Sequence, residues 1–240
     1  NNLWDDTSLI LTTDHGFMLG EHDWWAKNRM PLYNEIANVP LFFYHPDYKK
    51  YQGEQRDVVT QNIDLMPTFL SMHGHSIPKE VTGKSLIEFL DKDSSQKYSA
   101  LYGYWGGGIN ITDGEYTYFH YPENFSQQNP NRYQYTLMPT HMRQFFSLEE
   151  LQTAAMHKPF NFTKDVPVMK INRIERKTDG GYKGYEDTKS ALYDLKHDPG
   201  QLSPLDNEVL LKKYQDMMIK MIKQSDPPKE LLHNYFNIKN

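Results

Sequence analysis

Three side chains near the start of the chain could together hold a cation and an anion. Asp14 and His15 follow residues 8–11, an apolar run typical of a buried parallel β-strand, after Thr12 and Thr13. Because ligands of open α/β sheets bind at the carboxyl ends of strands, we expect both side chains to face a binding site. A carboxylate and an imidazole there can bind a divalent ion, and the Lys27 ammonium can bind an anionic group beside it. The Asp-His pair alone is weak evidence, since an aspartate often caps a loop and a histidine often packs.

The loop between this pair and the lysine contains further groups that could do chemistry. His22 is expected either to line the pocket or to orient the loop by hydrogen bonding. Glu21 is expected to be structural. A complete small metallohydrolase stays open as well, built from Asp14, His15, Glu21, His22 and Asp23. Activity of this chain with added metal would support that reading.

The composition excludes several classes of protein and site. The 240 residues include no cysteine, so this chain can hold no disulfide framework, thiolate metal site or cysteine nucleophile. The net charge of -5 at pH 7 gives no support for nucleic-acid binding. The sequence has no run of about 18 apolar residues, so we expect no membrane partner. No signal segment is visible, and the compartment stays undetermined.

The order of elements indicates an α/β fold up to residue 90. Residues 7–12 and 39–44 are expected to be buried strands, and residues 62–70 a helix. Asp64 is the expected N-cap of that helix. Because alternating strands and helices are typical of an α/β layer, residues 1–90 are expected to form one part of the fold.

After residue 91 the pattern changes to short strands and one long helix. Residues 112–115, Thr-Asp-Gly-Glu, indicate a β-hairpin. Asp206 is expected to cap a last amphipathic helix. Residues 122–180 contain many Pro and Asn and are expected to be a long irregular segment. We therefore expect residues 91–240 to form a small α+β subdomain, with an antiparallel sheet and a terminal helix.

Taken together, these motifs resemble those of the sulfatase family, within the alkaline-phosphatase-like superfamily. The first motif combines Asp14-His15-Gly16, Leu19-Gly20-Glu21-His22 and Lys27 with the spacing that sulfatases have. Later segments match in the same order: Val39-Pro40-Leu41, Ile63-Asp64-Leu65-Met66-Pro67-Thr68, Gly83-Lys84-Ser85-Leu86, Thr112-Asp113-Gly114 and Leu192-Tyr193-Asp194-Leu195. The resemblance covers essentially the whole chain. It implies the C-terminal part of an alkaline-phosphatase-like α/β sandwich, followed by the small α+β subdomain.

The resemblance implies roles for particular residues. Asp14 and His15 would be two ligands of the active-site divalent cation, which is commonly calcium in this family. Mn²⁺ and Mg²⁺ stay open, because calcium prefers oxygen ligands to imidazole. Lys27 would contact the sulfate oxygens of the substrate and stabilise charge in the transition state, and His22 would belong to the same catalytic group.

The substrate implied is a sulfate ester, on a carbohydrate or another small organic molecule. His141 and Arg143 would reach it, since arginine binds sulfate well. Sulfatases use a cysteine or serine converted to formylglycine within a Cys/Ser-x-Pro/Ala-x-Arg signature, and no such segment occurs here. The chain therefore resembles a C-terminal fragment, with formylglycine and two further acidic metal ligands expected in a missing N-terminal part. We expect the fragment alone to be inactive.

Two other functions stay open. Phosphonate monoester and phosphodiester hydrolases of the same superfamily share the Asp-His pair and a similar loop. A non-catalytic module could instead hold a sulfated glycan with its tyrosines and tryptophans. In either case, a half-sheet would expose a strand edge and an apolar face, so homo-oligomers are a further expectation.

Overall fold

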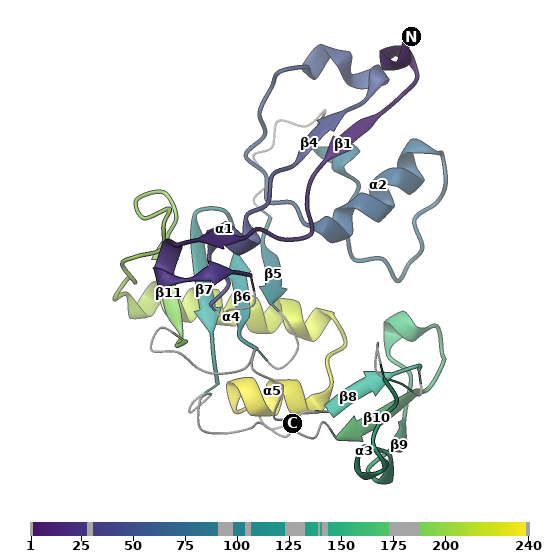
Figure 1. The fold of residues 1–240 in the computed structure, drawn as a ribbon, viewed down its shortest axis with the longest axis vertical. Helices are drawn as coiled ribbons and strands as arrows, with labels where there is room; N and C mark the ends of the chain where they lie inside the picture. The colour runs from purple at the N-terminus through teal and green to yellow at the C-terminus, as the bar shows by residue number, and fades with distance from the viewer. Residues whose placement is uncertain are drawn as a thin grey trace.

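The computed structural model of the protein describes residues 2–27, 31–90, 98–103, 107–122, 133–138, 140, 144–172 and 188–238. Its elements form three groups (Figure 1). The first contains β1 (Leu9–Leu11), β4 (Phe42–Tyr44) and α2 (Leu65–Met72), the second a four-stranded sheet with α4 (Glu208–Gln224), and the third a small three-stranded sheet. Short 3-10 helices lie at Leu3–Asp5, Glu21–Asp23, Pro46–Tyr51, Asn62–Asp64, Leu86–Phe89 and Asn161–Thr163. None of the helices in these ranges has both the length and the apolar character that a membrane span requires.

The four-stranded sheet is antiparallel throughout, with the strand order β11-β7-β6-β5. Its strands are β5 (Ala100–Gly103), β6 (Ile109–Thr112), β7 (Tyr116–His120) and β11 (Ala191–Asp194). The hairpin predicted at residues 112–115 is confirmed and joins β6 to β7. One carboxylate oxygen of Asp113 accepts hydrogen bonds from the amides of Glu115 and Tyr116 at 3.0 Å each, which fixes the turn. The middle of β6, including Asn110, is buried between the two neighbouring strands.

The two faces of this sheet carry different layers, because successive side chains of a strand point to opposite sides. One face packs on α4 in a cluster that contains Ile111, Tyr118, Leu192, Tyr214, Met218 and Ile222. The opposite face packs on the N-terminal segment in a cluster that contains Met18, Tyr33, Ile36, Phe119, Ala191 and Tyr193. Figure 1 shows α4 on one side of the sheet and α1 (Asn34–Ala37) on the other. The sheet is therefore a middle layer that supports the segment between Asp14 and Lys27.

Helix α4 confirms the predicted amphipathic helix, but its N-cap is Asn207 and not Asp206. The Asn207 side chain accepts a hydrogen bond from the Leu210 amide at 3.0 Å, whereas Asp206 lies one residue too early to serve the first turn. The Tyr214 hydroxyl donates to the Asp113 carboxylate at 2.7 Å and so joins the helix to the hairpin. A further helix that the sequence did not predict, α5 (Lys229–Phe236), follows α4.

A buried histidine fastens α5 to the sheet. His120 Nε2 lies 2.6 Å from the Tyr235 carbonyl oxygen, and its Nδ1 lies 2.9 Å from the Tyr118 hydroxyl. The ring also stacks on Phe236, with 4.4 Å between centroids. Burial lowers the pKa of His120, and the hydrogen bond with Tyr235 only partly opposes it. The neutral ring, donating from Nε2 and accepting at Nδ1, satisfies every one of these contacts.

The prediction of an irregular segment over residues 122–180 is wrong for much of its described part, which contains a third sheet. β8 (Tyr133–Thr136), β10 (Val168–Asn172) and β9 (Ala155–His157) pair antiparallel in that order, and α3 (Leu148–Gln152) contacts β10. These strands are short, and cross-strand partners such as Gln134 and Ile171 are far apart in the sequence. No local pattern marks such a pairing, which explains the error. The division into two units near residue 91 stays a prediction.

The strand predicted over residues 7–12 is present as β1, but it is neither parallel nor buried. It pairs antiparallel with β4, which matches Leu11 with Phe42. Leu9, Leu11 and Phe42 are 52%, 60% and 65% exposed. The reason is that no element in the described ranges covers these three side chains. Self-association through this face stays a prediction.

A buried carboxylate joins α2 to a distant loop. Asp64 accepts hydrogen bonds from the amides of Gln61 and Lys84 at 2.8 Å each, so its side chain connects two segments and does not cap α2 as predicted. Gly83 passes so close to Ile63 that a Cβ there would lie 2.2 Å from the Ile63 carbonyl oxygen. The sequence motif that contains Asp64 and the one that contains Gly83 and Lys84 therefore pack against each other.

Candidate active site

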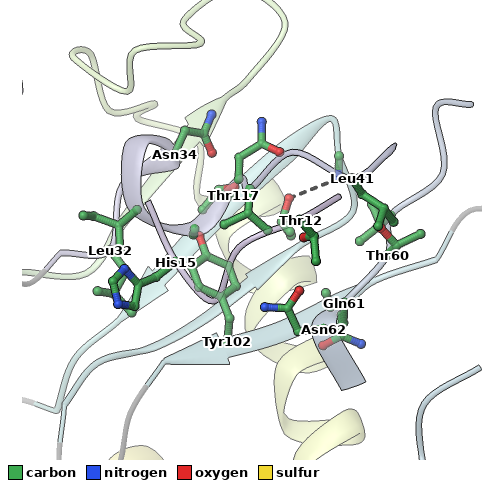
Figure 2. A pocket seen from close by; sticks show the side chains of 18 of the residues that line it. Thr12, His15, Leu32, Asn34, Leu41, Thr60, Gln61, Asn62, Tyr102 and Thr117 are labelled. Atoms are coloured by element: carbon green, nitrogen blue, oxygen red, sulfur yellow. Dashed lines mark hydrogen bonds between the residues drawn. The ribbon is translucent and has the colours of Figure 1, made fainter. Parts of the chain in front are cut away.

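A cavity of about 1210 Å³ lies between the C-terminal end of β1 and the four-stranded sheet (Figure 2). Three of the predicted site residues, Asp14, His15 and Lys27, line it. Apolar side chains such as Leu32 and Leu41 line much of the rest, together with hydroxyl and amide groups from Thr12, Asn34, Thr60, Gln61, Asn62, Tyr102 and Thr117. Burial raises the pKa of the Tyr102 phenol, so that it keeps its proton as a hydrogen-bond donor. The cavity thus combines a charged end with walls of apolar and neutral polar groups.

Asp14, His15 and Lys27 meet within this cavity. Lys27 Nζ lies 2.9 Å from His15 Nε2, and His15 Nε2 lies 3.3 Å from Asp14 Oδ2. His15 Nδ1 lies 2.9 Å from the Gly16 carbonyl oxygen. Because a carbonyl oxygen only accepts hydrogen bonds, we assign the proton to Nδ1, which leaves the neutral ring a lone pair on Nε2. An ammonium, an imidazole lone pair and a carboxylate therefore converge.

The carboxylate and the imidazole suit a divalent cation. Two ligand atoms bound to one ion at about 2.0–2.4 Å lie roughly 3 Å apart, close to the separation of Asp14 Oδ2 and His15 Nε2. A hydrogen bond from the other ring nitrogen to a backbone carbonyl is typical of metal-binding histidines. Within the described ranges, no group of three His, Asp or Glu side chains forms a metal site. These two residues fit part of a coordination shell.

The Asp14 carboxylate is open to solvent and keeps its charge at neutral pH. Its side chain is 80% exposed. Desolvation raises the pKa of the carboxyl, but the His15 ring and hydrogen bonds from the His15 amide and the Thr13 hydroxyl outweigh it. The net result is a pKa below the ordinary value. A carboxylate of this kind is ready to bind a cation.

The backbone of the motif is held by a side chain that the sequence did not indicate. Asn62 Nδ2 donates to the carbonyl oxygens of Thr13 and Asp14 at 3.1 Å and 3.3 Å. Asn62 directly precedes the Ile63-Asp64 motif. Its position beside that motif is the one feature of the sequence that could have indicated a role for it. The contact joins the two motifs and fixes the direction in which β1 ends.

The glycine that follows the pair is required by packing against α1. The Gly16 amide donates to the Ile36 carbonyl at 2.8 Å. A Cβ on Gly16 would lie 1.7 Å from the Glu35 carbonyl oxygen, a distance that no side chain can adopt. Only glycine allows this approach, so the third residue of the Asp-His-Gly motif is explained by its contact with the helix.

Lys27 follows a small hairpin with an unusual backbone. Its strands are β2 (Met18–Leu19) and β3 (Trp25–Ala26). Gly20, His22, Asp23 and Ala26 have φ values of 128°, 51°, 55° and 111°. Positive φ is strained for residues other than glycine, and such strain is common at functional sites. The hairpin was not predicted, because two-residue strands leave no periodic pattern.

His22 lies in the loop of the hairpin and does not line the cavity. Its ring stacks on Tyr33 with 3.5 Å between centroids and an interplanar angle of 3°. Its side chain is 8% exposed, and Nε2 lies 3.8 Å from Glu35 Oε2. Glu21 accepts a hydrogen bond from the Leu19 amide. Of the two predicted placements, these contacts match the one in which His22 orients the loop; its catalytic role stays a prediction.

Two predicted substrate residues, His141 and Arg143, lie outside the described residues. Their contribution to the site stays a prediction. The complete metallohydrolase of five residues is disfavoured, because Glu21 and His22 point to other partners than Asp14 and His15.

Comparison with known proteins finds sulfatases among the proteins that this chain is similar to. The family described as N-sulphoglucosamine sulphohydrolase, C-terminal, matches residues 20–129. An N-acetylglucosamine-6-O-sulfatase of Bacteroides thetaiotaomicron is 33% identical over 105 residues, which cover 42% of this chain and 18% of that protein. A multifunctional alkaline phosphatase superfamily protein of Trinickia caryophylli is 36% identical over 88 residues, which cover 36% of this chain and 16% of that protein.

The overall fold was compared with solved structures. A 2-O GAG sulfatase superposes with a TM-score of 0.57 at 18% sequence identity, covering 98% of this chain and 39% of that one. The similarity of fold therefore extends over nearly every part of the chain. In both comparisons the chain spans well under half of the length of its relatives.

Proposed function

We propose that the protein is a sulfatase, which hydrolyses sulfate esters with Asp14, His15 and Lys27 in its active site. The sequence resemblance and the expected alkaline-phosphatase-like fold of the C-terminal part are confirmed by these relatives. The residue roles that follow belong to the proposal.

One observation carries the proposal. The Lys27 ammonium lies 2.9 Å from the imidazole of His15, which lies 3.3 Å from the Asp14 carboxylate. Side chains that bind an anion and side chains that bind a cation are thus in contact in one cavity. A sulfate ester bound to a divalent cation needs both, because its oxygens carry a negative charge that increases on the leaving group during hydrolysis.

Asp14 and His15 would hold the cation as two of its ligands, with Ca²⁺ as the first candidate and Mn²⁺ or Mg²⁺ as alternatives. When bound, the cation would polarise the sulfate and the nucleophile. Asn62 and the close packing of Gly16 keep the two ligands in place. Lys27 would bind the sulfate oxygens and stabilise the charge that develops on them.

The nucleophile is not among the 240 residues. No Cys/Ser-x-Pro/Ala-x-Arg signature occurs in the sequence, and cysteine is absent. We therefore propose that formylglycine and the remaining metal ligands are supplied from outside this sequence, and that the 240-residue chain alone does not turn over sulfate esters. Activity of the purified chain on an aryl sulfate above that of a Lys27→Ala variant would contradict this.

The proposed substrate is a sulfated carbohydrate. The relative from Bacteroides thetaiotaomicron is named for a sulfated sugar. In this chain, the hydroxyl and amide wall of the cavity, including Asn34, Asn62 and Tyr102, offers hydrogen bonds that suit sugar hydroxyls. A volume of about 1210 Å³ has room for more than one sugar ring.

The test uses the full-length gene product with 4-nitrophenyl sulfate and with 6-O-sulfated N-acetylglucosamine. Lys27→Ala should lower kcat/KM by about 10²–10³-fold, the usual effect of removing a group that stabilises transition-state charge. Lys79→Ala is the matched control, because Lys79 is exposed and does not line the cavity. Equal activity of both variants would overturn the role of Lys27.

A second candidate function is hydrolysis of phosphonate monoesters or phosphodiesters. The relative from Trinickia caryophylli, named as a multifunctional member of the alkaline phosphatase superfamily, favours it. The ratio of kcat/KM for 4-nitrophenyl sulfate to that for bis(4-nitrophenyl) phosphate decides between the two. Binding of a sulfated glycan by the full-length protein without turnover of either ester would instead indicate a binding module.

A further inference from the structure

We propose that Glu35 is a positioning residue which, through His22, fixes the hairpin of residues 18–27 so that Lys27 stays beside the Asp14-His15 pair. The inference rests on the function proposed above, because it concerns how the sulfate-binding lysine is placed. It goes beyond that function in assigning a role to a residue that does not line the cavity.

Glu35 touches the metal-ligand side of the site through its backbone. Its carbonyl oxygen lies where a Cβ of Gly16 would be, and the next residue, Ile36, accepts the Gly16 amide at 2.8 Å. The segment that carries Asp14 and His15 therefore packs directly against α1.

The Glu35 carboxylate faces the lysine side of the site, beside His22. Glu35 Oε2 lies 3.8 Å from His22 Nε2, and the two side chains are 23% and 8% exposed. The His22 ring is held flat against Tyr33, which is itself buried in the cluster on the sheet. Helix α1 thus lies next to both the segment with Asp14 and His15 and the hairpin that leads to Lys27.

The hairpin needs such support because its own structure is weak. Its strands contain two residues each, so few ladder hydrogen bonds hold them. His22, Asp23 and Ala26 have positive φ, and a non-glycine residue in a sparsely populated region costs about 1–3 kcal/mol and persists only when the surroundings impose it. Ala26 immediately precedes Lys27, so relaxation of its backbone would redirect the lysine.

The helix that carries Glu35 is fixed at its other end. The Gln201 side chain accepts a hydrogen bond from the Asn34 amide at 2.6 Å, in the first turn of α1, and Gln201 is 1% exposed. Asn34 Nδ2 also donates to the Pro199 carbonyl at 3.1 Å. Glu35 therefore projects from an element that a distant part of the chain, residues 199–201, holds in place.

The decisive experiment is a double-mutant cycle in the full-length gene product. Glu35→Gln keeps the size of the side chain and removes its charge, and it should lower kcat/KM for 4-nitrophenyl sulfate about tenfold, because a small displacement of a positioned group is costly. In a Lys27→Ala background the same change should lower kcat/KM less than about twofold, since the group being positioned is absent. Glu88→Gln, at an exposed position, is the matched control and should change neither value. Additive effects of Glu35→Gln and Lys27→Ala would overturn the proposal.

A second measurement does not depend on activity. Amide hydrogen exchange over residues 18–27 should increase in Glu35→Gln and in His22→Phe, which retains stacking on Tyr33, while exchange over the β6–β7 hairpin stays unchanged. Unchanged exchange in the hairpin would overturn the proposal whatever the kinetics. If exchange increases but Lys27→Ala retains full activity, the positioning contact stands and the proposed function of Lys27 fails.

Discussion

The four-stranded sheet and the β1–β4 pair are built from similar apolar residues but lie in opposite environments. Ile111, Tyr118 and Leu192 of the sheet are almost completely buried under α4, whereas Leu9 and Leu11 of β1 are more than half exposed. An apolar strand pattern therefore predicts a strand in both regions but burial only in the one that a helix covers. Burial depends on a covering element, which lies elsewhere in the sequence.

The two regions also differ in what holds them. The sheet and α4 are joined by a continuous apolar cluster. The end that carries the site shares a smaller apolar cluster with the sheet. It also depends on polar and backbone contacts: the Asp64 carboxylate, the Asn62 amide and the approach of Gly16 to α1. We expect this end to be sensitive to loss of single hydrogen bonds and tolerant of changes in its apolar strands.

The largest expected difference concerns Met218 and Leu11. Met218→Ala empties a fully buried position on α4 and should lower the free energy of unfolding by about 3 kcal/mol. Leu11→Ala, on the uncovered strand, should change it by less than about 0.5 kcal/mol. Urea unfolding of both variants measures the difference. Equal losses would show that β1 is covered in solution.

Asp64→Ala tests the polar support of the site region. It leaves the amides of Gln61 and Lys84 without their acceptor in a buried place, and should lower the free energy of unfolding by about 2 kcal/mol. Asp216→Ala is a control, because Asp216 is exposed and forms an ion pair with Lys212 along α4, a contact that contributes about 0.3–0.5 kcal/mol. A loss no larger than that of the control would show that the Asp64 contact does not support α2.

His120 should make the covered sheet sensitive to acid. Because burial lowers its pKa in the folded state, the unfolded chain binds the proton first as the pH falls below about 6.5. Stability is therefore fully present above that pH and is lost toward the lower folded pKa, by at most about 1.4 kcal/mol per pH unit. Thermal unfolding between pH 5 and pH 7.5 measures this. His120→Phe should remove this part of the slope, and an unchanged slope would exclude His120 as its source.

The smallest effect is expected for a single hydroxyl. Tyr214→Phe removes the hydrogen bond to Asp113 and should lower the free energy of unfolding by about 1 kcal/mol. Tyr44→Phe, which removes a solvent-exposed hydrogen bond to the Trp4 carbonyl, should cost less than about 0.5 kcal/mol. The reverse order would mean that the uncovered region depends more on its hydroxyl contacts than the covered one.

Local patterns in the sequence predicted the elements that depend on local physics. The Asp113 turn and the apolar face of α4 were predicted correctly, because a hairpin turn and an amphipathic helix are determined by residues close together in the sequence. The third sheet was missed because β8 and β10 pair across a long stretch of chain. The exposure of β1 was not predicted for a related reason. Whether a strand is buried depends on elements that are distant from it in the sequence.

The candidate site shows the same division. Asp14, His15 and Lys27 were identified from their types and spacing, and they meet in the cavity. The contacts of Asn62 and Glu35 were not predicted, because each acts through a partner that only the folded chain brings near. Gly16 was recognised as part of a motif, but its reason, the approach to α1, is three-dimensional.

The burial of Asn110 in β6 bears on the choice of expression host. Asn110-Ile111-Thr112 is an acceptor sequence for N-linked glycans in eukaryotic secretory pathways. A glycan on this side chain has no room between β5 and β7, so its attachment would have to precede strand pairing and would then prevent it. Asn161, in an exposed turn of a second acceptor sequence, carries no such conflict. Secretion from a eukaryotic cell would therefore set glycosylation against folding at one asparagine, whereas expression in the bacterial cytosol avoids that competition.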